Sequence, residues 1–200
     1  MMAQGGYVVL AWFKPHEADK QAFAGRMRDE AAKVRSGGLA RQFEFHAAAD
    51  SGDEFMLYEE FASEADWQAH HDAPVIAELR GTIAPMIAEQ TRSVWSQVAG
   101  FVKQDAAPGH STRVLFRMEP ASVQPMVAEM TNDVASAGGM LRFDLNENAD
   151  DPGAFLICAR WADRAAWQAH QTDPDYLAFR ERTAAFYATK PDRTLWRPLR

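Results

Sequence analysis

Hydrophobic residues along the first forty positions change from strand-like to helix-like spacing. The run YVVLAWF at 7–13 is rich in β-branched and aromatic residues, which predicts a strand ending at Pro15. Apolar residues then recur at helical spacing, at Ala22, Phe23, Met27, Ala31 and Val34. They predict a helix that stops at the pair Gly37 and Gly38.

The following residues predict a hairpin, two helical segments and a closing strand. LARQFEFHA at 39–47 alternates apolar and polar residues, DSGDE reverses the chain, and FMLYEEF at 55–61 is the partner strand. One helical segment is expected from Ser63, its N-cap, to His71, and a second from Pro74 to about Glu89. TRSVWSQV then supplies the last strand of the unit.

The second half of the chain repeats this pattern. DWQAHHDAP at 66–74 returns as AWQAHQTDP at 166–174, and eight of the twenty positions in 55–74 are identical at a shift of 100. Nearer the N-terminus we expect a shift of 105, with a first helix about five residues shorter in the second copy. KQDAAPGHS, residues 103–111, has the composition of an exposed linker. The predicted division is therefore 1–102, a linker at 103–111, and 112–200.

Each copy has the order βαββαβ, which predicts an α+β protein made of two tandem ferredoxin-like repeats. A single such sheet exposes one apolar face and two edges. Two sheets that pack face to face and close their edges remove both problems. We therefore expect an intramolecular dimeric α/β barrel, a pseudo-dimer in one chain, and leave open whether it forms a further homodimer.

Composition excludes several classes of partner and cofactor. A net charge of −7 without any Lys/Arg cluster argues against nucleic acids and anionic membranes. The apolar run at 7–13 is too short for a signal core or a membrane span, so the expected location is the cytoplasm. The single cysteine, Cys158, is expected to be a buried apolar residue. No phosphate-binding loop or metal-ligand cluster is present in the sequence, so no cofactor and no metal are expected.

The order of elements, the strands FMLYEEF and FLICARW, the residues Ser63 and Asp163 after them, and the repeated WQAH together resemble the antibiotic biosynthesis monooxygenase family. The resemblance covers about 95 residues of each half. It implies a cofactor-independent monooxygenase of the dimeric α/β-barrel superfamily, acting on a small aromatic or polyketide-like molecule.

The family pattern, Tyr-Glu-x-Trp followed by a His nine positions later, is divided between the two copies. The first copy has Tyr58, Glu59 and Phe61, whereas the second has Cys158, Ala159 and Trp161. Both copies keep the His. The resemblance therefore implies catalytic roles for His70, His170 and Tyr58, and a substrate pocket formed by Glu59, Phe61, Trp161, Trp67 and Trp167.

Each assignment has a structural alternative. The two histidines can satisfy backbone carbonyls at helix ends, and Trp67 and Trp167 can anchor the short helices to the sheets. Tyr58 and Glu59 are neighbours on one strand, so at most one of them enters a given cavity. Because each copy has lost different family residues, we expect two unequal pockets, of which at most one is fully active.

Two other functions compete with catalysis. The same fold could be a non-catalytic binding module for a hydrophobic ligand such as haem. It could also be a structural protein whose cavities are filled by Trp and Phe side chains.

Overall fold

The computed structural model describes residues 2, 3, 5–38 and 40–200. Leu39, the first residue of the predicted second strand, lies outside the described residues. The chain forms two compact units: a first unit of residues 5–96 and 197–200, and a second unit of residues 97–196 with the N-terminal residues. Two of the boundaries between the units, at 96/97 and 196/197, fall inside strands.

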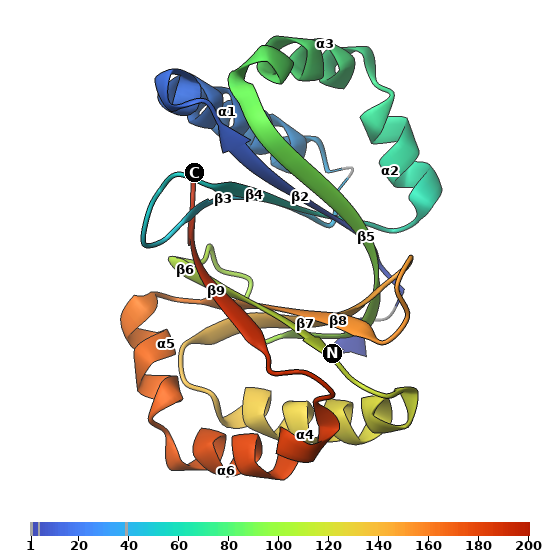
Figure 1. Ribbon diagram of the computed structural model, residues 1–200, viewed down its shortest axis with the longest axis vertical. Helices are drawn as coiled ribbons and strands as arrows, with labels where there is room; N and C mark the ends of the chain where they lie inside the picture. The colour runs from blue at the N-terminus through green and yellow to red at the C-terminus, as the bar shows by residue number, and fades with distance from the viewer. Residues whose placement is uncertain (1, 4, 39) are drawn as a thin grey trace. The chain divides into compact units, whose positions relative to one another are not determined.

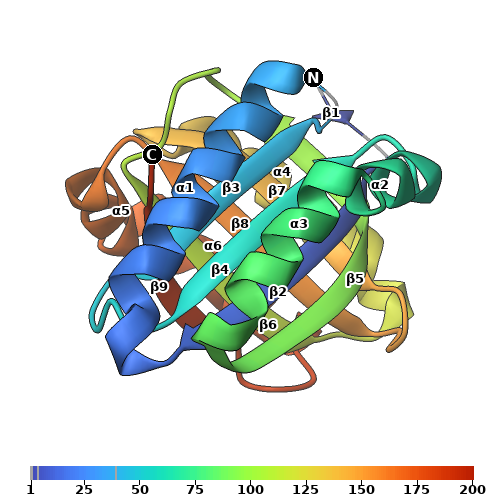
Figure 2. The same cartoon turned by 90° about the horizontal axis from the view of Figure 1, so that it is seen from above.

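The first unit is a four-stranded antiparallel sheet with helices on one face (Figure 1). Its strands are β2 (Tyr7–Pro15), β3 (Gln42–Ala48), β4 (Phe55–Phe61) and the first part of β5 (Ile87–Val102); its helices are α1 (Lys20–Gly37), α2 (Glu64–His71) and α3 (Pro74–Ile83), with short 3-10 turns at Glu17–Asp19 and Ala84–Met86. The strand order β5-β2-β4-β3 is that of a ferredoxin-like fold. Figure 2 shows α1 and α3 lying over its strands.

The second unit repeats this arrangement. Its strands are β6 (His110–Arg117), β7 (Met140–Asn148), β8 (Ala154–Trp161) and β9 (Asp192–Pro198); its helices are α4 (Val123–Ser136), α5 (Arg164–Gln171) and α6 (Pro174–Thr183), with 3-10 turns at Pro120–Ser122 and Ala184–Phe186. The order β9-β6-β8-β7 matches that of the first unit. The short strand β1 (Met2–Ala3) pairs with residues 100 and 101 of β5. The α+β class and the two tandem ferredoxin-like repeats are confirmed.

Local signals in the sequence explain where most helices begin and end. Ser63 accepts a hydrogen bond from the Asp66 backbone N–H at 3.2 Å, and Asp163 does the same for Ala166 at 2.8 Å. Gly38 ends α1 with a φ of 70°, in the left-handed region that glycine adopts without strain. The helix predicted to run from Pro74 to about Glu89 ends earlier, at Ile83. Pro85 lacks the N–H needed to continue it.

The strand register corrects the alignment between the repeats near their N-termini. Phe13 pairs with Phe55 in the first unit, and Phe116 pairs with Phe155 in the second. The first strands therefore correspond at a shift of 103, and the predicted shift of 105 is wrong. The buried faces of α1 and α4 agree with 103: Phe23, Met27 and Glu30 correspond to Met126, Met130 and Asp133.

Each sheet buries an apolar face beneath its helices. In the first unit Phe23 lies against Phe13, Phe45 and Phe55, with ring centroids 5.4–6.1 Å apart. In the second unit, Met126 and Met130 of α4 pack with Phe155 and Leu145. These aromatic and methionine contacts hold the helices to the sheets, because burial of such large side chains is the dominant favourable term in folding.

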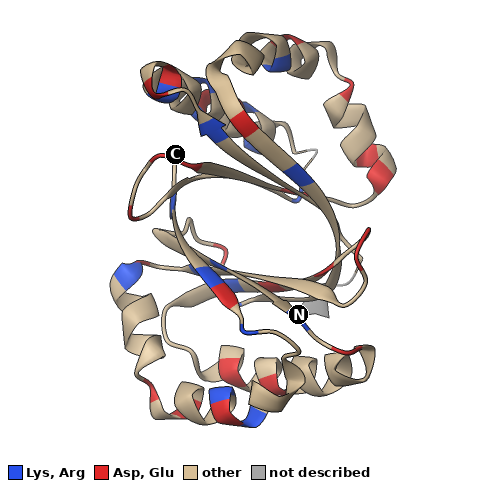
Figure 3. Ribbon diagram, in the orientation of Figure 1, with Lys and Arg blue, Asp and Glu red and all other residues tan. Residues whose placement is uncertain are grey.

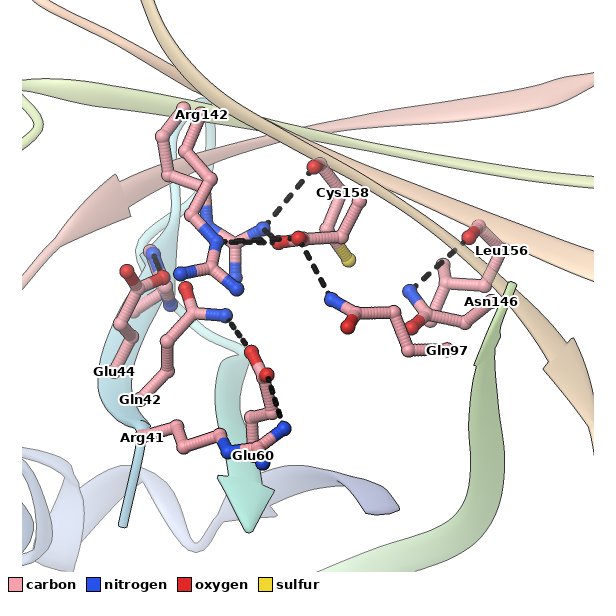
Figure 4. A network of polar contacts seen from close by, with 12 residues as sticks. Arg41, Gln42, Glu44, Glu60, Gln97, Arg142, Asn146, Leu156 and Cys158 are labelled. Carbon is pink, nitrogen blue, oxygen red and sulfur yellow. Dashed lines mark hydrogen bonds and ion pairs between the residues drawn. The ribbon is translucent and has the colours of Figure 1, made fainter. Parts of the chain in front are cut away.

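The other face of the second sheet carries polar side chains around a fully buried carboxylate. Asp144 accepts hydrogen bonds from Arg142 at 3.0 Å, Arg160 at 2.6 Å and Gln97 at 3.0 Å. Figure 4 shows Arg142 and Gln97 among the side chains of this polar network. On the first sheet, Gln42 donates to the buried carboxylate of Glu60. Hydrogen bonds and counter-charges make the burial of these groups tolerable.

Charged residues on the helices are of both signs and are interspersed (Figure 3). None of the helices in the described part of the chain combines the length and apolar character that crossing a membrane requires.

Candidate functional site

Each unit contains a cavity between its sheet and its helices. The cavity of the first unit has a volume of about 280 Å³, and that of the second unit about 560 Å³. Six of the eight residues expected from the sequence line them: Glu59, Trp67 and His70 in the first cavity, and Trp161, Trp167 and His170 in the second. Only the second cavity is within the usual range of roughly 300–1,000 Å³ for ligand pockets.

The two remaining residues, Tyr58 and Phe61, are not part of the cavity lining. Tyr58 is fully buried on the opposite face of β4, because successive strand side chains alternate and its neighbour Glu59 faces the first cavity. Phe61 lies on the same face as Glu59 but at the end of the strand. There its ring packs against His70, with centroids 5.4 Å apart. Phe61 therefore packs against the histidine without lining the cavity.

In the second cavity, His170 is hydrogen-bonded to an acid on a neighbouring helix. Its Nε2 lies 3.3 Å from Oδ1 of Asp133, which α4 supplies, and both side chains are buried. A carboxylate accepts hydrogen bonds, so Nε2 carries a proton and Nδ1 keeps its lone pair. Nδ1 lies 3.4 Å from the Gln171 side-chain nitrogen, and Gln171 also lines the cavity. This arrangement suits a general base.

Two aromatic side chains pack against the His170 ring. The Trp161 ring lies 4.9 Å from it and the Tyr176 ring 4.1 Å, measured between centroids. Nε1 of Trp161 is buried and has no hydrogen-bond acceptor among the described residues. A buried donor of this kind is costly unless a ligand or water satisfies it.

Arg193, from β9, completes the wall of the second cavity. Its guanidinium donates to the Tyr176 hydroxyl at 2.8 Å and to the Gln171 side-chain oxygen. Burial raises the pKa of Tyr187, another lining residue, so its hydroxyl stays protonated at neutral pH. The cavity is therefore aromatic over much of its wall and has fixed polar groups beside the histidine.

The first cavity has a carboxyl group where the second has Ala159. Glu59 is buried, accepts a hydrogen bond from Nε1 of Trp67 at 3.2 Å, and lies 4.0 Å from Nε2 of His70. Burial raises the pKa of Glu59 from 4.5 to about 7, while the hydrogen bond from Trp67 and the charge of Arg92 oppose this shift. At neutral pH Glu59 therefore exists in both protonation states.

The two histidines of α2 differ in their surroundings. His70 is packed between Phe43 and Phe61, and burial lowers its pKa, an effect that the charge of Glu30 opposes. His71 stacks on Trp67 at 4.8 Å between centroids and contacts Arg80, and its pKa is lowered chiefly by burial. In the described part of the chain, no three His, Cys, Asp or Glu side chains are grouped as metal ligands.

Replacing Glu59 by Gln is expected to stabilise the protein at alkaline pH and to have little effect at pH 5. The folded protein holds the Glu59 proton up to about pH 7, whereas the unfolded chain releases it near 4.5. The free energy of unfolding of the wild type therefore falls as pH rises through this window. At about 1.4 kcal/mol per pKa unit, the variant gains up to about 3 kcal/mol at pH 8.

Urea unfolding at pH 5 and pH 8 measures this difference. The matched control is Glu64→Gln, an exposed residue of α2, for which the difference from wild type is expected to be the same at both pH values. A Glu59→Gln variant whose advantage does not grow with pH would show that the Glu59 carboxyl titrates normally.

Sequence reasoning did not identify two residue pairs that line both cavities. Glu30 and Asp133 face His70 and His170, and Arg92 and Arg193 come from the last strand of each unit. Both pairs can be recognised from patterns in the sequence. Each acid interrupts the apolar stripe of its helix, and each arginine begins a repeated Arg-Ser/Thr-Val/Leu-Trp motif, 101 residues apart. A shift of 105 does not align Glu30 with Asp133, so the correspondence between the two acids was missed.

Solved structures with the same arrangement of elements match the whole chain. A candidate monooxygenase from Fusobacterium nucleatum subsp. nucleatum is 9% identical, with a TM-score of 0.82 over 98% of this chain and 94% of that one. A candidate monooxygenase from Lactobacillus acidophilus is 16% identical, with a TM-score of 0.78 over 98% and 95%. An anthrone oxidase-like protein is 12% identical, with a TM-score of 0.65 over 100% and 95%. At these identities the likeness shows the fold alone.

No curated protein matches the sequence. A family model, described as antibiotic biosynthesis monooxygenase, matches residues 6–81 and 122–182, one segment in each repeat. The first segment contains β2, α1, β3, β4 and α2, and the second contains α4, β7, β8 and α5, so both include the helix that carries the histidine. The chain belongs to the antibiotic biosynthesis monooxygenase family.

Proposed function

We propose that this protein is a cofactor-independent monooxygenase that oxidises a small aromatic substrate in the cavity of its second unit. The observation that carries the proposal is the hydrogen-bonded pair of His170 and Asp133 on the wall of a cavity of about 560 Å³. The aromatic rings of Trp161 and Tyr176, which pack against His170, provide surfaces for a planar substrate to stack on.

The reaction requires removal of a proton from an electron-rich ring system such as an anthrone. A substrate that displaces the Gln171 side chain brings its acidic C–H or O–H to Nδ1 of His170, which takes the proton. Asp133 then stabilises the imidazolium that forms, through Nε2. The electron-rich anion passes an electron to dioxygen, and recombination and loss of water give the quinone. In balance, a CH₂ group and O₂ become C=O and H₂O.

Trp161 is assigned the stabilisation of the substrate anion. Its Nε1–H is buried and has no acceptor among the described residues, so a substrate that shifts the side chains covering it would bring its oxyanion, a strong acceptor, to this donor. Phe61 holds the corresponding position in the first unit and has no donor. The apolar surroundings strengthen this hydrogen bond because competing water is excluded.

The two cavities are proposed to be unequal in activity. The first is about half the volume of the second, lacks the tryptophan donor, and has Glu59 in the space that Ala159 leaves open. His70 lies near two carboxyl groups, those of Glu59 and Glu30, and burial lowers its pKa. These differences favour the second unit as the site of reaction.

Oxygen uptake tests the proposal. Purified protein, treated with chelator and free of added cofactor, is mixed with anthrones and dihydroxynaphthalenes in an oxygen-electrode cell. Uptake above the buffer rate that is lost on heat denaturation, with one O₂ consumed per quinone formed, supports the proposal. Absence of uptake across the panel favours the alternative, a binding module of the same fold. A hemin titration followed at the Soret band then examines haem as its ligand.

A further inference from the structure

We infer that the second cavity selects an anionic aromatic ligand, an arene that carries a carboxylate, and that Arg180 and Lys190 bind the acid group at its mouth. This inference names the substrate class of the proposed function and rests on it for its chemical meaning. The binding itself can be tested without any reaction.

The charges around the second cavity carry the inference. Its lining contains three cationic side chains, those of Arg180, Lys190 and Arg193, and one carboxylate, that of Asp133. Asp133, buried and hydrogen-bonded to His170, balances one of these charges, so the lining keeps an excess of two positive charges. The cationic residues are exposed, whereas the inner wall is apolar and aromatic. A ligand with an aromatic body and an anionic end matches this distribution.

Arg193 and Arg180 are held beside the same aromatic ring. Arg193 donates to the Tyr176 hydroxyl at 2.8 Å, and the guanidinium carbon of Arg180 lies 6.0 Å from the centre of the Tyr176 ring. Among the described residues, neither Arg180 nor Lys190 has a carboxylate partner within 4.0 Å. Their positive charge remains available to a ligand.

The first cavity provides an internal comparison. Arg80 and Arg92 correspond to Arg180 and Arg193, but two carboxyl groups, Glu30 and Glu59, line the same cavity. Its formal charge is therefore balanced when both acids are ionised. In the second cavity Ala159 replaces Glu59, which removes one negative charge, and Lys190 adds a positive one. The excess of positive charge is specific to the larger cavity.

Calorimetric titration of the intact protein with 2-naphthoate and with its neutral amide, 2-naphthamide, tests the inference. Neither probe has a hydroxyl group that could lose a proton to His170, so binding is measured without oxidation. At 50 mM NaCl the acid is expected to bind about tenfold more tightly than the amide, since two partly screened ion pairs each contribute up to about 1 kcal/mol. This preference should shrink at 500 mM NaCl, where exposed charges are screened within a few ångströms.

The double variant Arg180→Gln/Lys190→Gln is expected to lose the tenfold preference and to leave the amide affinity unchanged. The matched control is Arg182→Gln, which removes an equal kind of charge from the same helix, at an exposed residue outside the cavity lining. The control is expected to bind the acid within about twofold of wild type, because Arg182 lies outside the lining and its guanidinium is already paired with Glu129 at 2.9 Å. Since all three side chains are exposed, the variants should keep the thermal midpoint of the wild type.

Three results would overturn the inference: equal affinity for acid and amide, no binding of either probe, or an equal loss of acid affinity in the control and the double variant. The outcome is separable from that of the proposed function. Acid-selective binding in a protein that consumes no oxygen with any hydroxylated arene rejects the monooxygenase and retains the charge assignment. Oxygen uptake with neutral arenes, in a protein that binds acid and amide equally, retains the monooxygenase and rejects the charge assignment.

Discussion

Oxygen uptake is expected to fall at least about 100-fold when His170 is replaced by Gln, because a positioned general base contributes roughly 10²–10⁴ in rate. Gln fills similar space and can still contact Asp133, but it has no lone pair of comparable basicity. The variant therefore removes the proton acceptor with little change in the shape of the cavity. Initial rates with the best anthrone of the panel measure the effect.

The matched variant is His70→Gln in the first unit. It is expected to keep the wild-type rate within about twofold, since the first cavity has about half the volume of the second and no counterpart of the Trp161 donor. Thermal midpoints of both variants exclude loss of folding. Equal losses of activity in the two variants would reject the assignment of the reaction to the second unit.

Replacing Asp144 by Ala is expected to reduce the free energy of unfolding by about 3–5 kcal/mol, the usual effect of removing one partner from a buried ion pair. Asp144 is fully buried and accepts hydrogen bonds from Arg160, itself 2% exposed, and from Arg142 and Gln97. The variant leaves the buried guanidinium of Arg160 without this counter-charge. Urea unfolding followed by tryptophan fluorescence measures the loss.

An exposed pair in the same unit is the control. Glu129 accepts from Arg182 at 2.9 Å near the surface, so Glu129→Ala is expected to change stability by no more than about 1 kcal/mol. If Asp144→Ala lost no more than this control, the polar cluster around Asp144 would have no role in holding the second unit together.

The duplication in the sequence predicted the fold because it repeats features that determine local structure. Helix caps at Ser63 and Asp163, the stop at Gly38 and alternating apolar strands are all local signals, and the structure retains each of them. The ends of elements were less predictable. The last helix of the first unit stops before Pro85, where the chain enters a strand that depends on pairing with β2.

The site was only partly predictable, because it depends on distances between elements. Strand alternation places Glu59 in the cavity and Tyr58 outside it, and the sequence allowed either but not both. The pairing of His170 with Asp133 joins residues 37 positions apart and depends on how α4 and α5 pack. The raised pKa of Glu59 depends on burial by side chains from several elements, which no spacing along the chain expresses.

The unequal cavities also have a consequence for how this protein can evolve. In an assembly of identical copies, one codon specifies both members of each symmetric pair, so every substitution changes both sites at once. Here Glu59 and Ala159, or Phe61 and Trp161, are encoded separately. Selection can preserve one site while the other drifts or acquires a new ligand. The fused gene thus removes the symmetry constraint, and the smaller cavity becomes free to change without loss of the larger one.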